Sequence, residues 1–323
     1  KRQGVNASMT TYCIFCEELA RGSMSLAACA AMQSLMGTNF LYRFGTKEHK
    51  ERLLIPALKG EKIAAFALTE PDAGSDLGAI RTTAHRKGDE WVLNGSKTWV
   101  TSGTQAHFFT VLASTDKSKG LEGLDFFLVE KNTPGLSVGR KIGKLGVRAS
   151  ENTELALDDV CIPEKNLLGE EQGKGFVYLQ EILNSIRVMT GALALGIGRA
   201  AYEEGLKYAK QRVQFGRPIG KFQAIQFKLA DMATELEAAR WLVYRAAWLL
   251  DQGKPNTKEA AMAKLYASEA ANKIADETCR IHASYGFSMD YAAQRYFRDA
   301  RFLLPGAGTS EILRLIIGRE LGL

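Results

Sequence analysis

The chain has 323 residues and a formal net charge of +6, and 46% of its residues are hydrophobic and 24% charged. These values are ordinary for a globular protein and argue against a disordered chain. Lys and Arg are interleaved with acids, which disfavours nucleic-acid binding, whereas a modest positive excess suits a ligand that carries phosphates. No apolar run approaches the roughly 18 residues of a membrane span, and no signal-peptide pattern is present. We therefore expect a cytoplasmic protein, or a mitochondrial matrix protein if the source is eukaryotic.

Residues 1–65 are rich in Ala, Met, Leu and Glu, and they predict an N-terminal domain of packed helices broken at glycines. Cys13 and Cys16 form a CxxC pair there, but the surrounding pattern is that of an amphipathic helix. No second CxxC or nearby His pair completes a metal site. The five cysteines are odd in number and widely spaced, so we expect neither a disulfide framework nor a metal.

Residues 66–170 predict a small antiparallel β-domain, because short runs of β-branched and aromatic residues alternate with turn signals. We expect one turn at Asn94–Gly95 and another at Pro134–Gly135.

Helical periodicity returns in residues 171–323. Apolar residues recur on one face of the stretch that contains Leu229, Met232, Leu236 and Val243. Further helices are predicted at 176–213, 257–284, 290–300 and 309–320. The chain is thus predicted to be mainly α with a central β-domain, and the last part is predicted to form an antiparallel helix bundle.

Four segments resemble the signatures of the FAD-dependent acyl-CoA dehydrogenase family, in the family's order and spacing. They are FALTEPDAGSD at 66–76, TWVTSG at 98–103, QRVQFGRPIGKFQ at 211–223 and AGTSEILR at 307–314. The resemblance covers nearly the whole chain. It implies the family's layout of an N-terminal helical domain, a β-barrel-like domain and a C-terminal four-helix bundle. Family members usually begin with some tens of additional helical residues, so we expect either that this chain begins partway into the first domain or that its N-terminal domain is reduced.

The resemblance implies FAD as the cofactor and assigns its contacts. Residues implied to line the flavin ring or its edge are Phe66, Leu68, Thr69, Trp99 and Thr101. Ser75 is implied to donate to the pyrophosphate. Considered singly, Phe66 and Trp99 could instead be plain core of the β-domain, and Thr69 and Ser75 could be turn formers.

A second set of implied cofactor contacts lies in the C-terminal part of the chain. Arg212 and Phe215, together with Gln223, match a motif that contacts the pyrophosphate and adenine of FAD in a neighbouring subunit. Arg suits this role because its planar fork grips phosphate oxygens. The remaining implied contacts are Arg280, where the family often has Gln, Gly286 and Thr309. The resemblance therefore also implies a homotetramer or dimer.

Members of the family use a carboxylate to remove the α-proton of an acyl thioester while the β-hydrogen leaves as hydride to the flavin. The backbone N–H beside that carboxylate, here on Gly308, helps to polarise the thioester carbonyl. In most members the carboxylate is a glutamate, but Ala307 occupies that position here and has no proton-accepting group. A second position used by some relatives, just before a family arginine that matches Arg187, holds Ile186. A purely structural role for Arg187, buried between helices and paired with an acid, is equally compatible with the sequence.

Three explanations of Ala307 remain open. An engineered Glu-to-Ala change is disfavoured by Gly306, where the family usually has an aromatic residue. A natural member could have altered chemistry, or the base could be relocated. For a relocated base, Glu181 lies about 140° from Ile186 around a helix at roughly 100° per residue, and Glu311 fits better as an acid at a helix N-terminus.

The leading function is FAD-dependent oxidation of an acyl thioester, carried by CoA or an acyl-carrier protein, to its α,β-unsaturated product. Electron-transferring flavoprotein is the implied electron acceptor. The alternatives are a non-oxidising flavoprotein lyase or desulfinase-like enzyme, and a catalytically silent flavin-binding subunit.

Overall fold

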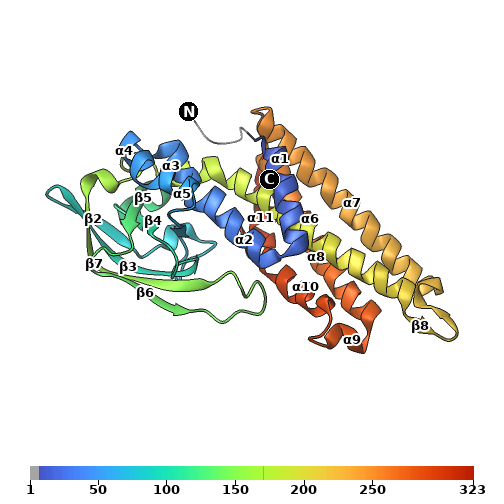
Figure 1. Cartoon of the computed structure of the whole chain (residues 1–323). Coiled ribbons are helices and arrows are strands. Elements are labelled where there is room, and N and C mark those ends of the chain that lie inside the picture. Colours follow the sequence, from blue (N-terminus) through green and yellow to red (C-terminus); the bar gives the residue numbers. More distant parts are fainter. Residues whose placement is uncertain (1–6, 170) are drawn as a thin grey trace. The chain divides into compact units, whose positions relative to one another are not determined.

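The structure is a computed structural model that describes residues 7–169 and 171–323. The internal contacts divide the described chain into two compact units. One, which we call the β-unit, comprises residues 29–144 and 148–183. The other, which we call the helical unit, comprises residues 7–28, 145–147 and 184–323 (Figure 1). The boundaries of the three predicted domains, 65/66 and 170/171, stay a prediction.

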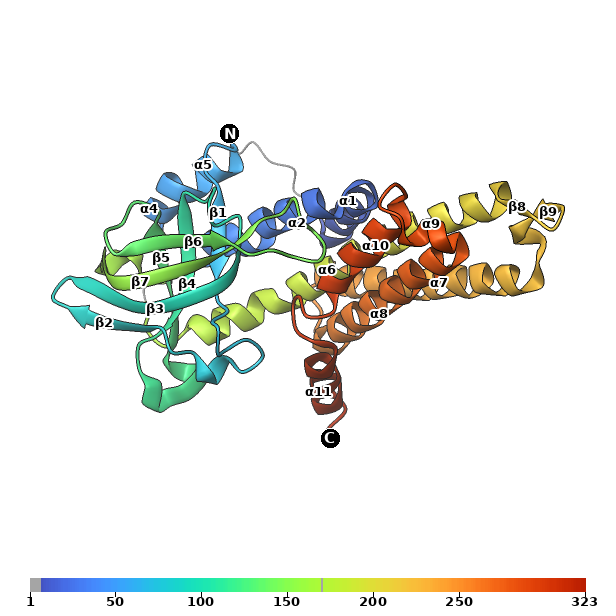
Figure 2. The same ribbon diagram turned by 90° about the horizontal axis from the view of Figure 1, so that it is seen from below.

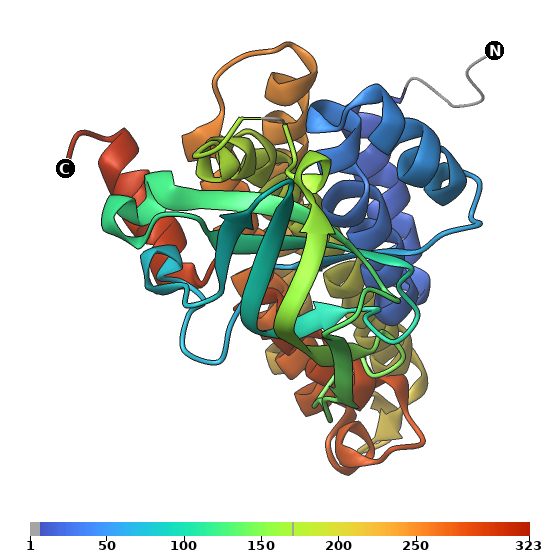
Figure 3. The ribbon, with the colours of Figure 1, turned by 90° about the vertical axis from the view of Figure 1, so that its left-hand side faces the viewer.

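The β-unit is built on a seven-stranded sheet in the order β1-β4-β2-β3-β7-β6, with β5 paired to β4. Its strands are β1 (Ala64–Ala67), β2 (Thr83–Lys87), β3 (Glu90–Thr101), β4 (Phe108–Ser114), β5 (Leu124–Glu130), β6 (Leu136–Lys141) and β7 (Asn152–Pro163). The long strands β3 and β7 run side by side and antiparallel (Figure 3). The sheet is mainly antiparallel, as predicted, but β1 pairs parallel with β4.

The turn predicted at Asn94–Gly95 is wrong, because both residues lie inside β3. The pairing of β3 with β7 shifts register between Leu93 and Gly95, which is the mark of a β-bulge. The Asn94 side chain exchanges two hydrogen bonds with Asp159 of β7, one with its backbone N–H at 2.8 Å and one with its carboxylate at 2.9 Å. These cross-strand bonds keep Asn94 in the sheet. The predicted turn at Pro134–Gly135 lies between β5 and β6, as expected.

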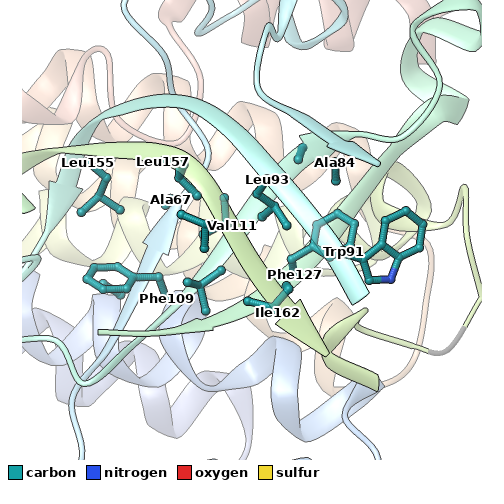
Figure 4. Packing of buried hydrophobic residues seen from close by; sticks show 14 of the residues in the cluster. Ala67, Ala84, Trp91, Leu93, Phe109, Val111, Phe127, Leu155, Leu157 and Ile162 are labelled. Atoms are coloured by element: carbon teal, nitrogen blue, oxygen red, sulfur yellow. The ribbon is translucent and has the colours of Figure 1, made fainter. Parts of the chain in front are cut away.

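One face of the sheet forms a buried apolar cluster, because alternate residues of each strand point to the same side (Figure 4). Trp91 and Phe127 meet edge to face there, with ring centroids 5.3 Å apart. Short helices belong to the same unit: η1 (Met32–Gly37), α3 (Asn39–Phe44), α4 (Lys47–His49), η2 (Lys50–Leu54) and α5 (Ile55–Leu58).

The helical unit contains long helices that match the predicted periodicity. Its elements are α1 (Met9–Gly22), most of α6 (Gly175–Gln211), α7 (Gln223–Asp251), α8 (Thr257–His282), α9 (Ser284–Phe287), α10 (Ala292–Ala300) and α11 (Ser310–Glu320), and α2 (Met24–Ala31) runs from this unit into the other. Helices α7 and α8 run alongside each other (Figures 1 and 2). On α7 the buried face includes Leu229, Met232, Leu236 and Val243, as the sequence predicted. The mainly helical fold with a central β-domain is thus confirmed.

Helix α1 is attached to the bundle through the buried carboxylate of Glu17, which is 2% exposed. It accepts hydrogen bonds from Arg240 Nη1 at 2.9 Å and from the Tyr244 hydroxyl at 2.7 Å, and a longer one from Arg199 Nη1 at 3.4 Å. Hydrogen bonds to a charged group contribute more than neutral ones, and an unpaired buried charge is costly.

We expect Glu17→Gln to lower the free energy of unfolding by about 1–3 kcal/mol, since the two arginines lose their buried partner while staying partly hydrated. Denaturant unfolding measures the change. The matched control is Glu18→Gln, because Glu18 is an exposed neighbour that also pairs with Arg199. Exposed ion pairs contribute only about 0–1 kcal/mol. Equal losses in the two variants would contradict a special role for the buried carboxylate.

Candidate functional site

The segment that follows β1 is held by a buried ion pair that the sequence analysis missed. Lys97 Nζ lies 2.7 Å from Glu70 Oε1 and donates to the Leu68 carbonyl oxygen at 3.1 Å, and both charged side chains are almost fully buried. Glu70 also accepts hydrogen bonds from the backbone N–H of Arg81 at 2.7 Å and of Thr82 at 3.0 Å. The backbone of Leu68 and its neighbours is therefore fixed in place.

The buried pair perturbs both pKa values. Burial lowers the pKa of Lys97 to about 8, although the Glu70 charge works against this. Burial would raise the pKa of Glu70, but the charge and hydrogen bond of Lys97, aided by the Thr82 and Arg81 donors, bring it below its ordinary value. Both groups are charged at neutral pH, so the positive charge of Lys97 and the negative charge of Glu70 neutralise each other inside the β-unit.

Trp99 presents its indole on the surface of the β-unit, with 54% of the residue exposed. Its backbone has φ 59°, a left-handed conformation that is rare for a bulky residue. Asn152 Nδ2 donates to the Trp99 carbonyl oxygen and to Thr101 Oγ1, each at 3.0 Å. The Thr98 N–H donates to the Thr69 carbonyl oxygen at 2.9 Å. The predicted flavin contacts Thr69, Trp99 and Thr101 thus lie on connected backbone of the β-unit, and Trp99 is not a plain core residue.

Phe66 differs from Trp99 because it is part of the aromatic packing of the β-unit. Its ring stacks on Phe40, with centroids 5.1 Å apart, and tilts against Phe126 at 5.6 Å. Phe66 and Leu68 are half-buried, which leaves part of each side chain accessible to a ligand. Ser75 is exposed, in a loop that continues into a short helical turn capped by Asp76. The structure thus gives Phe66 a packing role in addition to the predicted contact.

In the helical unit, Arg212 and Phe215 lie on the short hairpin of β8 (Val213–Gln214) and β9 (Arg217–Pro218). Phe215 has φ 52° and is 93% exposed. The guanidinium of Arg212 lies over the ring of Tyr285, 5.6 Å from its centroid. A cation beside an aromatic face, with an exposed phenyl ring nearby in sequence, suits a ligand that has both phosphates and a planar base.

The other predicted contacts near the hairpin have distinct settings. Gln223 is exposed at the first position of α7. Arg280 is exposed and pairs with Asp276 at 2.7 Å, so its charge is already partly compensated. A Cβ atom at Gly286 would lie 2.2 Å from the Cys279 carbonyl oxygen, so only glycine fits there. Gly286 is therefore required for the close packing of α9 against the end of α8, whether or not it also contacts the cofactor.

Ala307, Gly308 and Thr309 form the loop before α11. Ala307 has φ 59° and Gly308 has φ 101°, and the Thr309 side chain caps the helix by accepting from the Ile312 N–H. Lys264 Nζ donates to the carbonyl oxygens of Gly308 at 2.7 Å and Leu304 at 3.0 Å. The Lys264 side chain is fully buried and ties this loop to α8.

Arg187 lies on α6, next to the buried Ile186, and is itself only 7% exposed. Its Nη1 donates to Asn184 Oδ1 at 3.1 Å, while its Nε has no hydrogen-bond partner among the described residues. Among the described residues no carboxylate forms an ion pair with Arg187, and burial lowers the pKa of its guanidinium. The interpretation of Arg187 as half of a buried ion pair is therefore wrong for the described part of the chain.

The two candidate relocated bases have other roles. Glu181 is exposed and lies 3.7 Å from Arg43. Glu311 lies in the first turn of α11, where backbone and Thr309 hydrogen bonds lower its pKa. The prediction that Glu311 is a helix N-terminal acid is confirmed.

Three family models match the chain: the acyl-CoA dehydrogenase N-terminal domain at residues 2–61, the middle domain at 65–160 and the C-terminal domain at 173–322. The chain belongs to the acyl-CoA dehydrogenase family. It is therefore an oxidoreductase that uses FAD and acts on acyl-CoA thioesters.

Individual relatives agree with this assignment. The chain of this acyl-CoA dehydrogenase is 53% identical over 317 residues to the benzylmalonyl-CoA dehydrogenase of Aromatoleum aromaticum, covering 98% of this chain and 83% of the relative. It is 45% identical to the mitochondrial short-chain specific acyl-CoA dehydrogenase of Rattus norvegicus, with 98% and 77% covered. The solved butyryl-CoA dehydrogenase from Megasphaera elsdenii superposes with a TM-score of 0.95 at 41% identity, with 98% and 83% covered.

The residues of this acyl-CoA dehydrogenase are suited to binding FAD. The surface indole of Trp99 can stack on a flavin ring, and the backbone that Lys97 fixes can form hydrogen bonds with its edge. The guanidinium of Arg212 can bind phosphate oxygens. Within the helical unit, the hairpin group and the loop before α11 are separate (Figures 1 and 2). Lys264 and Arg280, which mark the two groups on α8, are about 24 Å apart at 1.5 Å per residue.

No helix in the described ranges has the length and apolarity needed to cross a membrane. In the same residues, no cluster of His, Cys, Asp and Glu is suited to a metal. Cys13 and Cys16 are buried on α1, as predicted.

Proposed function

We propose that this enzyme oxidises a 2-carboxyacyl-CoA, and that departure of CO2 takes the place of proton abstraction. The observation that carries the proposal is Ala307, which stands where the family resemblance implies a glutamate base and has no proton-accepting group. The relative at 53% identity is named for benzylmalonyl-CoA, a thioester whose α-carbon carries a free carboxylate. Such a substrate needs no base on the protein.

The electron balance is complete without a protein base. When the bond between the α-carbon and the carboxylate breaks, its electron pair stays on the α-carbon and CO2 departs. That pair forms the α,β double bond as the β-hydrogen leaves with its own two electrons. FAD would supply the acceptor for this hydride. The products are CO2, the enoyl-CoA and reduced flavin, and the single negative charge of the carboxylate ends on the flavin.

A glutamate at position 307 would also be unfavourable for this substrate. Two like charges about 4 Å apart repel by about 1 kcal/mol in water and by about 4 kcal/mol near a protein surface. Alanine removes this repulsion. The backbone N–H of Gly308 is assigned to the thioester carbonyl, whose polarisation stabilises the negative charge that develops as CO2 leaves.

The proposed cofactor contacts are given for each unit separately. On the β-unit, the residues assigned to the flavin and its pyrophosphate are Phe66, Leu68, Thr69, Ser75, Trp99 and Thr101. On the helical unit, those assigned to FAD are Arg212, Phe215, Gln223, Arg280, Gly286 and Thr309. The separation of the hairpin from the loop before α11 supports a homo-oligomer in which the hairpin serves the FAD of a neighbouring subunit. Electron-transferring flavoprotein is the proposed electron acceptor, by family resemblance.

The test compares two thioesters that differ only in the carboxylate. We expect benzylmalonyl-CoA to bleach the flavin absorbance of the anaerobic holoenzyme and to release one CO2 for each flavin reduced. 3-Phenylpropionyl-CoA, which lacks the carboxylate, should bleach it at least about 100-fold more slowly, since a positioned base contributes about 10²–10⁴-fold. Mass spectrometry of the product decides the outcome. An unsaturated product that keeps the carboxylate, or equal bleaching by both thioesters, would sink the proposal.

A further inference from the structure

Arg187 is a buried cation whose charge is not compensated within the described chain. It is 7% exposed, its Nε has no partner there, and among the described residues its one side-chain hydrogen bond goes to the neutral oxygen of Asn184. An unpaired buried charge is strongly unfavourable, and buried charges in folded proteins are normally paired. A site of this kind suits an anionic ligand that completes the pairing.

The position of the guanidinium is defined by a network of neutral side chains. Asn184 Nδ2 donates to Asn256 Oδ1 at 3.2 Å and to Thr257 Oγ1 at 3.1 Å. These bonds orient the Asn184 amide so that its oxygen faces Arg187. Asn256 is anchored in turn to the Ala246 carbonyl oxygen at 3.4 Å. Arg187 thus has one Nη bonded to a fixed acceptor, while its buried Nε has no acceptor among the described residues.

A second buried cation, Lys264, is bonded to the loop that carries Ala307 and lies within the electrostatic influence of Arg187. Its Nζ is bonded only to carbonyl oxygens in the described chain, including that of Gly308, the residue after Ala307. Burial, opposed by the acids Glu269 and Glu311 and aided by Arg187, lowers the pKa of Lys264 to about 8. Both acids are exposed, so the buried charges here are positive.

We propose that Arg187, supported by the field of Lys264, binds the free carboxylate on the α-carbon of the substrate. This inference rests on the proposed function, because it identifies the part of the protein that selects a 2-carboxyacyl-CoA. A guanidinium edge offers two parallel N–H groups that match a carboxylate in geometry. Alanine at 307 adds no further carboxylate that would compete with the substrate for Arg187.

The test is a binding experiment with malonyl-CoA and acetyl-CoA. These thioesters differ only in the carboxylate, and neither has a β-hydrogen to lose as hydride, so the flavin cannot oxidise them. Titration calorimetry on the FAD-loaded enzyme should show malonyl-CoA binding about 10- to 100-fold more tightly, the range expected of a charge-assisted hydrogen bond. Arg187→Gln should remove most of this preference, leaving only the smaller contribution of Lys264, and should leave acetyl-CoA binding unchanged. Arg187→Lys should keep part of it.

The control variant is Lys207→Gln, which removes an exposed cation from the same helix and should keep the full preference. A wild-type preference that survives Arg187→Gln, or an equal loss of affinity for both thioesters, would overturn the inference. Binding and turnover separate the two proposals. A malonyl-CoA preference that depends on Arg187, in an enzyme that does not oxidise benzylmalonyl-CoA, would refute the proposed function alone.

A measurement on the wild-type enzyme covers the case in which Arg187 variants do not fold. Below pH 8 both cations are charged, and above it Lys264 loses its proton. The preference for malonyl-CoA over acetyl-CoA should therefore fall as the pH rises through about 8, by a factor that reports the field of Lys264. Because both thioesters carry the same CoA moiety, the ratio of their dissociation constants is unaffected by any effect of pH on the binding of CoA itself. A wild-type ratio near one, or one that is constant from pH 6.5 to 9.5, would contradict the inference.

Discussion

We expect Ala307→Glu to let this enzyme oxidise 3-phenylpropionyl-CoA, a thioester that the wild-type enzyme should oxidise very slowly. The new carboxylate would supply the proton acceptor that the family resemblance places at this position. A positioned general base contributes about 10²–10⁴-fold, so the rate of flavin reduction should rise by that factor. Turnover of benzylmalonyl-CoA should fall at the same time, because the glutamate repels the substrate carboxylate and competes for Arg187.

The backbone already accommodates a side chain at this position. Ala307 has φ 59°, and the cost of the left-handed conformation arises mainly at Cβ, which alanine already carries. The substitution therefore adds little new strain. Anaerobic stopped-flow reduction of the flavin, with each thioester at several concentrations, separates the effect on binding from the effect on the chemical step.

Ala307→Gln is the matched control, because glutamine has the shape of glutamate without its basicity. It should leave the rate with 3-phenylpropionyl-CoA at the wild-type value. A relocated base predicts a different pattern, in which wild-type activity on that thioester is already high and is lost in Glu269→Gln. Glu269 is the natural choice for this comparison, since it accepts a hydrogen bond from Ser310 at 2.6 Å beside the same loop. Equal activity of the Glu and Gln variants at position 307 would contradict our prediction.

Lys97→Met is expected to destabilise the β-unit and to weaken FAD binding together. The substitution leaves the Glu70 carboxylate buried without its cation, a change that costs about 3–5 kcal/mol in comparable buried pairs. It also frees the Leu68 carbonyl oxygen, which Lys97 holds. Because Leu68 and Thr69 are assigned to the flavin edge, a looser backbone there should raise the dissociation constant of FAD.

Two measurements check this prediction: denaturant unfolding of the FAD-free protein, and fluorescence titration of FAD into it. Lys87→Met is the control, since Lys87 is an exposed lysine on the neighbouring strand β2. Replacing both partners, as in Lys97→Met with Glu70→Gln, should recover part of the stability, because no full charge is then left buried. Indistinguishable unfolding of the Lys97 and Lys87 variants would refute a supporting role for the pair.

Local patterns in the sequence were sufficient for the secondary structure of the helical unit. The helix predicted at 309–320 is observed as Ser310–Glu320, and that at 257–284 as Thr257–His282. The apolar period of α7 also placed Leu229, Met232 and Leu236 on the buried face. A helix is decided by residues three and four apart, so such patterns are visible in the chain itself.

In strand β3, by contrast, the local sequence pattern predicted the wrong structure. Asn-Gly is a strong local signal for a tight turn, yet Asn94 and Gly95 lie inside a strand, opposite an extra residue on β7. The deciding hydrogen bonds join Asn94 to Asp159, which is far along the chain. Pairing between distant strands therefore overrode a local preference.

The sequence by itself determined the family, the order of helices and strands, and the absence of a carboxylate at position 307. These follow from residue types and their spacing. Only the tertiary structure decided which charges are compensated, because burial and pairing depend on residues distant in sequence. It showed that Lys97 is neutralised by Glu70 and that Arg187, which the sequence allowed to be paired, has no acid among the described residues. A buried charge is stable only with a partner of opposite charge. The unpaired guanidinium of Arg187 is therefore the basis for proposing that the substrate carboxylate is its partner.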